Sequence, residues 1–290
     1  MKILILGGSG MLGFQLFKEW RESHTVRLTL RGSKEDYPTN TLLNADTNYF
    51  NVDVSLIDCL KSVLNDFRPD VVVNAIGITK QLTETLPVEV TNYVNARFPH
   101  FLSDICGQHQ CRLIHMSSDC VFSGKKGDYT EDDKPDAEDL YGQSKYLGEV
   151  SASHVLTLRK STIGLELSSS HGLIEWFLQQ QGNVRGYTKA IYSGLIASEL
   201  ASVIEKVLLG YPGLNGVFHV ASQAISKYDL LLKLSQHLNR KDINIIPFDD
   251  FICDRSLNGS RFSEITGYKA PSWDDMIVKL ASEISKREST

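Results

Sequence analysis

Residues 2–13, KILILGGSGMLG, decide the fold of this chain. The first six of them are predicted to form a buried strand, the glycines a turn, and a helix is expected over residues 11–20. In this G-x-x-G-x-x-G spacing Gly7 permits a tight turn, Gly10 lets backbone approach a pyrophosphate, and Gly13 lets helix and strand pack closely. The stretch therefore predicts a dinucleotide site, with a purely structural turn as the alternative. The residues expected to bind the cofactor are Gly7, Gly10, Met11, Leu12 and Gly13.

Short apolar runs alternate with amphipathic stretches through the first half of the chain. This alternation predicts an α/β fold with a Rossmann-type, doubly wound parallel sheet. One of its strands is expected at residues 49–54. Helical patterns dominate after residue 164, so we expect an NAD(P)-binding domain over residues 1–164 and a smaller, mostly helical substrate-binding lobe over 165–290. Strands near residues 217–221 and 243–248 are expected to return to the sheet.

Composition excludes several classes of function. A net charge of −5 without a basic run argues against a nucleic-acid partner. The five cysteines are odd in number and lack the C-x-x-C pairs of zinc sites, which predicts a reducing compartment and no metal. No stretch approaches the length of a membrane span, so we expect a cytoplasmic protein with no membrane partner.

The end of the second predicted strand indicates which dinucleotide is bound. An acidic residue there would bind the ribose hydroxyls of NAD, but this chain has LTLRGSK at residues 28–34. Arg31 offers positive charge where a 2′-phosphate would lie, which favours NADPH over NADH; a solvated arginine is the alternative. Asp53 could accept a hydrogen bond from the adenine amino group or could cap the following helix. Its neighbour Val54 is also expected at the cofactor.

Residues 141–145, YGQSK, place a tyrosine four positions before a lysine. On a helix these side chains share one face, so Lys145 could favour the ionised form of the Tyr141 phenol and make it a proton-transfer residue. For an isolated pair, a packed ring beside a solvated lysine is the alternative.

Six motifs together carry a resemblance to a known family. They are GGSGMLG, VVVNAIGIT, YVNARFP, HMSSDCVFSG, YTEDDKP and YGQSKYLGE. The chain resembles the extended short-chain dehydrogenase/reductase family, and within it the dTDP-4-dehydrorhamnose reductase branch of sugar-nucleotide-modifying enzymes. The resemblance extends into the second half, through GVFHVASQAISKYDLL and RSLNGSRFSEITGYKAPSWDDMI.

The resemblance implies a role for individual residues. Tyr141 and Lys145 match the catalytic pair, Ser118 matches the hydroxyl residue beside them with Ser117 as its alternative, and Asn95 matches the residue that supports the lysine through water. The residues implied at the cofactor after the fourth strand are Asn74, Ala75, Ile76 and Gly77. Those expected at the substrate are Ser117, Asp119, Arg255 and Arg261, the two arginines being available for a diphosphate or else simply solvated.

The expected function is NADPH-dependent reduction of a nucleotide-linked 4-keto-deoxysugar, for synthesis of cell-surface polysaccharide precursors. Tyr141 would deliver the proton and Ser118 would stabilise the developing negative charge. One alternative is a sugar-nucleotide epimerase or dehydratase of the same superfamily. Another is a non-catalytic NADP-binding subunit resembling the β subunit of methionine adenosyltransferase. The partner is then a nucleotide-diphosphate sugar, and a homodimer is compatible with the resemblance.

Two departures from the branch leave the sugar undetermined. Cys120 replaces the usual aromatic residue, and YTKAIYSGLIASELA at residues 187–201 replaces the usual glycine-proline-threonine segment.

Overall fold

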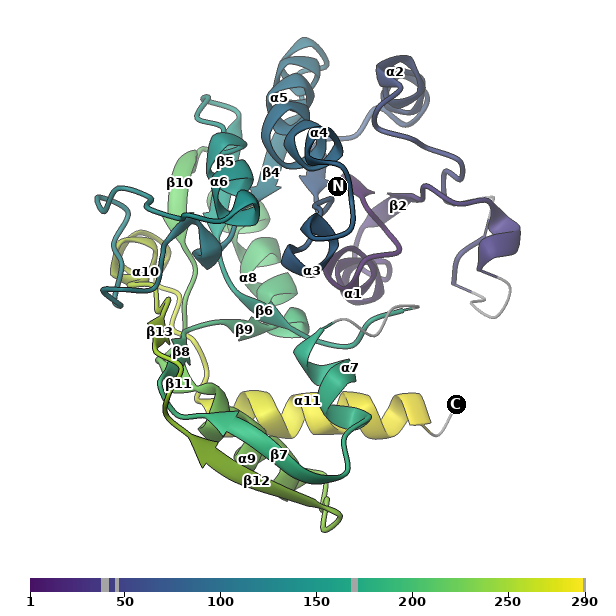
Figure 1. Cartoon of the computed structure of the whole chain (residues 1–290). Helices are drawn as coiled ribbons and strands as arrows, with labels where there is room; N and C mark the ends of the chain where they lie inside the picture. The colour runs from purple at the N-terminus through teal and green to yellow at the C-terminus, as the bar shows by residue number, and fades with distance from the viewer. Residues whose placement is uncertain (38–41, 45–46, 168–171, 289–290) are drawn as a thin grey trace. The chain divides into compact units, whose positions relative to one another are not determined.

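The computed structural model describes residues 1–37, 42–44, 47–167 and 172–288 (Figure 1). The chain divides into two compact units, each assembled from separate segments. The first unit comprises residues 1–117, 138–158 and 207–217, and the second comprises residues 118–137, 159–206 and 218–290. Whether the chain divides functionally at residue 164 stays a prediction.

The central sheet has six strands in the order β10-β5-β4-β3-β1-β2. The pairings of β1 with β2 and β3, of β3 with β4, and of β4 with β5 are all parallel. This confirms the predicted Rossmann-type sheet, and β10 confirms that residues near 217–221 return to it. The strands are β1 (Lys2–Leu6), β2 (Thr25–Thr29), β3 (Val71–Asn74), β4 (Arg112–Met116), β5 (Val155–Arg159) and β10 (Gly216–His219).

Helices lie on both faces of the sheet in the first unit, with α1 on one side and α2 and α5 on the other (Figure 1). Leu4 and Leu6 of β1 belong to one buried cluster with Leu64 of α2 and Leu102 of α5. Each such side chain contributes about 1.5–3 kcal/mol when fully buried. The helices of this unit are α1 (Met11–Trp20), η1 (Lys34–Asp36), α2 (Ile57–Phe67), α3 (Lys80–Thr83), α4 (Val88–Thr91), the π-helix η2 (Asn92–Arg97), α5 (Phe98–Gln108) and α6 (Leu140–Leu147).

The strand predicted at residues 49–54 is wrong. Tyr49 forms an isolated bridge to Thr29, and the Tyr49 and Val52 amides donate to β2-side carbonyls at 2.8 and 2.9 Å. Between them Asn51 has a φ of 56°, a left-handed conformation that interrupts extended pairing. The segment therefore follows the edge of the sheet without forming a continuous strand.

The second unit combines helices with small sheets. Its sheets have the orders β11-β8-β13, β12-β7 and β6-β9. The strands are β6 (Thr162–Ile163), β7 (Gly182–Tyr187), β8 (Ala190–Tyr192), β9 (Leu195–Ile196), β11 (Ile225–Ser226), β12 (Ile243–Phe248) and β13 (Cys253–Asp254). The helices are η3 (Asp119–Val121), α7 (Leu173–Leu178), α8 (Ala197–Gly210), whose last turn belongs to the first unit, α9 (Lys227–His237), α10 (Ser260–Thr266) and α11 (Trp273–Glu288).

The prediction that residues 243–248 join the central sheet is wrong, because β12 pairs in parallel with β7 instead. Helix α9 precedes β12 and contacts both strands, so the three elements form a β-α-β arrangement of their own.

Candidate functional site

The glycine turn is built as its spacing predicts. Gly7 has a φ of 83°, a conformation that favours glycine. The Gly10 amide donates to the Gly7 carbonyl at 3.1 Å. A Cβ on Gly13 would lie 2.2 Å from the Gly7 oxygen, so only glycine lets α1 start this close to the turn. Helix α1 has no side-chain cap at Gly10. Its first amides are therefore available for an acceptor such as a pyrophosphate, and the turn fits a dinucleotide.

Arg31 is exposed and directly follows β2 and Leu30. Ser33 and Asp36 form a reciprocal capping box around η1, in which the Ser33 amide donates to Asp36 Oδ2 at 2.7 Å. The hydrogen-bonding groups of Ser33 thus serve the local turn, and Arg31 remains the predicted residue with charge for a 2′-phosphate.

Asp53 holds the turn that precedes α2. Its Oδ1 accepts from the amide and the hydroxyl of Ser55, both at 2.8 Å. These hydrogen bonds lower the pKa of Asp53, and the nearby Arg31 charge adds to the effect. The Val54 carbonyl accepts from the Tyr93 hydroxyl at 3.0 Å. A contact from Asp53 to adenine stays a prediction.

The segment after β3 joins the glycine turn. Asn74 is buried, and its Oδ1 accepts from the Ile76 amide at 3.1 Å while its Nδ2 lies 3.1 Å from His115 Nδ1. The Ala75 amide donates to the Leu6 carbonyl at 3.1 Å, which ties the segment to β1. A Cβ added to Gly77 would lie 3.6 Å from Asn95 Oδ1 and 3.8 Å from Lys145 Nζ. The structure therefore brings Gly77, Asn95 and Lys145 together.

Helix α6 carries Tyr141 and Lys145 one turn apart. Asp139 caps this helix, because its Oδ1 accepts from the Gly142 amide at 2.8 Å, and its Oδ2 accepts from Lys80 Nζ at 2.8 Å. Tyr141 is half-buried. Lys145 is only 4% exposed, and its Nζ donates to the Met116 carbonyl at 2.6 Å. Lys145 is therefore not the solvated lysine of the alternative interpretation.

Asn95 lies in the π-helix η2, an element that often occurs at functional sites. Its side chain pairs with the backbone of Ile78 in both directions, at 2.9 and 3.0 Å, and donates to Ser144 Oγ at 3.2 Å. Gly148 ends α6 against this residue, since a Cβ on Gly148 would lie 1.9 Å from the Asn95 carbonyl oxygen. Sequence reasoning missed Gly148, although a glycine directly after the helix was a visible signal.

The two adjacent serines have different partners. Ser117 Oγ donates to Glu149 Oε1 at 2.7 Å within the first unit. Ser118 begins the second unit; its hydroxyl donates to Asp119 Oδ1 at 3.0 Å and accepts from the Cys120 amide at 3.1 Å. The Ser117 hydroxyl is thus bound to a carboxylate in the sheet-bearing unit, and Ser118 is the serine that lies next to Asp119.

The two predicted substrate arginines have different partners. Arg255 Nε donates to the Phe122 carbonyl at 2.9 Å and Nη1 contacts Cys120 Sγ at 3.6 Å, so Arg255 lies beside the loop of Ser118. Arg261 instead pairs with Asp132 at 2.6 Å. Burial raises the pKa of Cys120 to about 12, so its thiol stays protonated at neutral pH.

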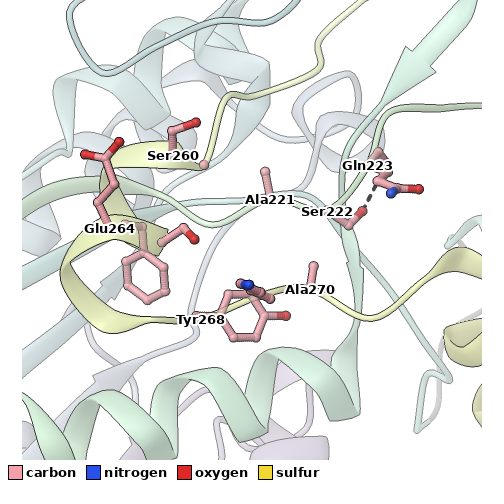
Figure 2. Close-up of a pocket in the computed structure, with 11 residues that line it drawn as sticks. Ala221, Ser222, Gln223, Ser260, Glu264, Tyr268 and Ala270 are labelled. Carbon is pink, nitrogen blue, oxygen red and sulfur yellow. Dashed lines mark hydrogen bonds between the residues drawn. The ribbon is translucent and has the colours of Figure 1, made fainter.

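Figure 2 shows a pocket of 430 Å³ in the second unit that contains none of the predicted site residues. Ser260 and Glu264 lie on one side of it and Ser222 and Gln223 on another, with Tyr268 below them. The Tyr268 hydroxyl donates to Glu199 at 3.0 Å.

Comparison with known proteins identifies the family. The family model described as the RmlD substrate binding domain matches residues 1–163. The chain belongs to this family. A dTDP-4-dehydrorhamnose reductase of Aggregatibacter actinomycetemcomitans is 29% identical over 250 residues, which cover 80% of this chain and 78% of the relative. The subunit beta of methionine adenosyltransferase 2 from Mus musculus is 24% identical over 86% of this chain and 75% of its own.

Solved structures share the fold of this chain. The dTDP-4-dehydrorhamnose reductase of Bacillus anthracis, solved with NADP, has a TM-score of 0.79 at 20% identity and covers 97% of this chain and 99% of its own. The predicted family is confirmed, and these relatives agree with the predicted class of NAD(P)-dependent oxidoreductase. Within the described ranges, none of the helices is long and apolar enough to span a membrane.

Proposed function

We propose that this member of the RmlD family is an NADPH-dependent reductase of a nucleotide-linked 4-keto-deoxysugar that supplies precursors of cell-surface polysaccharide. The observation that carries the proposal is the buried Lys145, one turn after Tyr141 and beside Gly77 and Asn95. An ammonium is rarely buried without a role, because desolvation disfavours its charged form.

NADPH supplies the hydride when it is bound. The turn from Gly7 to Gly13 offers the α1 amides to its pyrophosphate, and Gly77 leaves its backbone open beside Lys145. Lys145 donates to the Met116 carbonyl from beside Gly77, and its ammonium would also hold the ribose hydroxyls. Asn95 supports the lysine from the π-helix.

Tyr141 delivers the proton in this proposal. Reduction of a ketone needs a proton at the oxygen, and a free phenol with a pKa of about 10 is a slow donor and acceptor at neutral pH. A cation such as Lys145, one turn away on the same helix, would favour the phenolate form of Tyr141. Ser118 would donate to the substrate oxygen and stabilise its developing charge.

The substrate class is supported by the relatives. The reductase of Aggregatibacter actinomycetemcomitans is named for a dTDP-linked 4-keto sugar. Arg255, whose guanidinium lies beside the Ser118 loop, is the arginine that we assign to the substrate diphosphate.

The test measures NADPH absorbance with a dTDP-4-keto-6-deoxyhexose for the parent, Tyr141→Phe and Tyr146→Phe. Tyr146 is exposed on the same helix and serves as the matched control. Tyr141→Phe should lower turnover by about 10²–10⁴-fold with NADPH affinity preserved, since the ring remains and the transferred proton is lost. Parental turnover in Tyr141→Phe would reject the role of Tyr141.

A second candidate is a non-catalytic NADP-binding subunit. It is favoured by the methionine adenosyltransferase subunit beta relatives, which match a larger share of this chain than the reductase does. It predicts that NADPH binds but that its absorbance stays constant with 4-keto sugar nucleotides carrying either thymine or uracil.

A further inference from the structure

Three polar side chains of the second unit, Asp119, Lys160 and Tyr192, are brought together by neighbouring backbone segments. The Asp119 amide donates to the Lys160 carbonyl at 3.2 Å, so η3 lies against the residue that follows β5. The next carbonyl along, that of Ser161, accepts from the Leu195 amide at 3.1 Å, and β6 continues in parallel with β9. The Tyr192 ring lies in this corner, because a Cβ on Gly194 would be 2.6 Å from that ring and 2.8 Å from the Ser161 oxygen.

The ammonium of Lys160 is the second polar group of this corner. Among the described residues, its Nζ has neither a hydrogen bond nor an ion pair, although the side chain is only partly accessible. Burial lowers the pKa of Lys160, and the Asp119 charge opposes that shift. The two groups therefore interact electrostatically without closing into a salt bridge.

Tyr192 has an unsatisfied hydroxyl. Its Oη is closed to solvent and has no hydrogen-bond partner within the described part of the chain. The ring is held by Trp273 at a centroid distance of 5.4 Å, and burial together with the Asp119 charge raises the pKa of the phenol. An unmade hydrogen bond of this kind is costly, so such a group calls for an explanation. The acceptor that the Tyr192 hydroxyl lacks would be a hydroxyl of a bound ligand. Alternatively, a bound ligand would reorient the Asp119 carboxylate so that it accepts from Tyr192.

The three groups complement a hydroxylated ligand. An alcohol donates one hydrogen bond and accepts two, so vicinal hydroxyls can donate to Asp119 while they accept from Lys160 and Tyr192. The charges of Asp119 and Lys160 cancel, and Asp119 would repel a carboxylate or phosphate placed between them. Asp119 also accepts from Ser118, the predicted catalytic hydroxyl. These features favour a neutral sugar ring over an anionic group.

We propose that Asp119, Lys160 and Tyr192 form a subsite for the sugar ring of a nucleotide sugar, with Lys160 and Tyr192 as specificity-determining residues. This inference rests on the proposed function for its class of substrate. It assigns to Lys160 a contact with sugar hydroxyls and leaves the diphosphate to Arg255.

The test compares ligands with and without the sugar. Isothermal titration of the full chain with dTDP-glucose and with dTDP, and with UDP-glucose and UDP, measures the affinity that the sugar adds. Lys160→Met should weaken binding of the sugar nucleotide by about 10- to 100-fold and leave the nucleoside diphosphate unchanged, because a hydrogen bond from a charged donor is lost. Tyr192→Phe should cause a smaller loss of the same kind. Lys189→Met is the matched control, since this exposed lysine lies 3.9 Å from Asp249.

Three outcomes would overturn the subsite. An equal loss for sugar nucleotide and nucleoside diphosphate would place Lys160 at the diphosphate. Unchanged affinities in Lys160→Met would show that this lysine does not contact the ligand. If the parent protein binds dTDP-glucose no more tightly than dTDP, and UDP-glucose no more tightly than UDP, a sugar site is excluded. The titrations require no turnover. A failure of the proposed reductase activity would appear as constant NADPH absorbance, and it can thus be told apart from a failure of the subsite.

Discussion

Replacing Gly148 with alanine should disable the site by displacing Asn95. The backbone at Gly148 has φ −90° and ψ 0°, which alanine tolerates, so the substitution adds no conformational strain of its own. Its cost comes from the methyl group, which would lie 1.9 Å from the Asn95 carbonyl oxygen. Real Cβ atoms essentially never approach another atom within 3.0 Å, so α6 and the π-helix must separate by about 1.1 Å.

The separation acts directly on the predicted chemistry. Helix α6 carries Tyr141 and Lys145, while the Asn95 side chain holds Ile78 and Ser144. A misplacement of about 1 Å can cost about 10²-fold in rate, and an overpacked contact costs about 1–3 kcal/mol of stability. Gly148→Ala should therefore lose about 10²-fold in turnover and unfold at a lower urea concentration.

Turnover by NADPH absorbance, cofactor titration and urea unfolding would be measured on the same preparations. Gly213→Ala is the matched control, because no atom lies within 4 Å of a Cβ added there. Parental turnover in Gly148→Ala would refute the argument that contact between α6 and the π-helix positions the site. A loss of stability of equal size in Gly213→Ala would show that the close approach to Asn95 is not its cause.

Three further predictions address the cofactor and the second unit. Lys145→Met should lower both turnover and NADPH affinity, because it removes the charge near the Tyr141 phenol and the donor to the ribose. Steady-state kinetics and fluorescence titration would measure the two effects. A loss of turnover with unchanged NADPH affinity would contradict the ribose contact. Arg31→Ala should narrow the preference for NADPH over NADH in paired titrations, and equal affinities in the parent would refute the assignment. Burial, reinforced by the Arg159 charge, lowers the pKa of His219 to about 4, so the unfolded chain takes up the proton first as the pH falls below about 6.5. His219 therefore contributes stability above pH 6.5 that is lost towards pH 4, with about 2 kcal/mol lost by pH 5. Urea unfolding would measure how much the free energy of unfolding falls between pH 7 and pH 5, and this fall should be smaller in His219→Gln by that amount. An equal fall in the parent and in His219→Gln would contradict the prediction.

Local sequence patterns predicted the parts of the fold that depend on residues close together in sequence. The strand, turn and helix around Gly7, Gly10 and Gly13 follow from backbone conformation and close approach within thirteen residues, and the structure forms them as predicted. The parallel sheet follows from repeated alternation of apolar runs and amphipathic helices.

Strand pairing was less predictable, because a strand's partner is chosen by what lies beside it in space. Residues 243–248 have the pattern of a strand, but α9 places them beside β7 rather than in the central sheet. Residues 49–54 also have that pattern, and the left-handed conformation of Asn51 keeps them from pairing continuously with β2.

The sequence by itself determined the dinucleotide turn and the helix that carries Tyr141 and Lys145, since each of these depends on spacing along the chain. Only the tertiary structure decided that Lys145 is buried against Met116, that Gly148 must be glycine because of Asn95, and that the Asp119 amide pairs with the Lys160 carbonyl. The physical reason is that burial and close contact are properties of pairs of segments. A lysine in sequence is a solvated charge until the fold removes its water and leaves specific acceptors in reach.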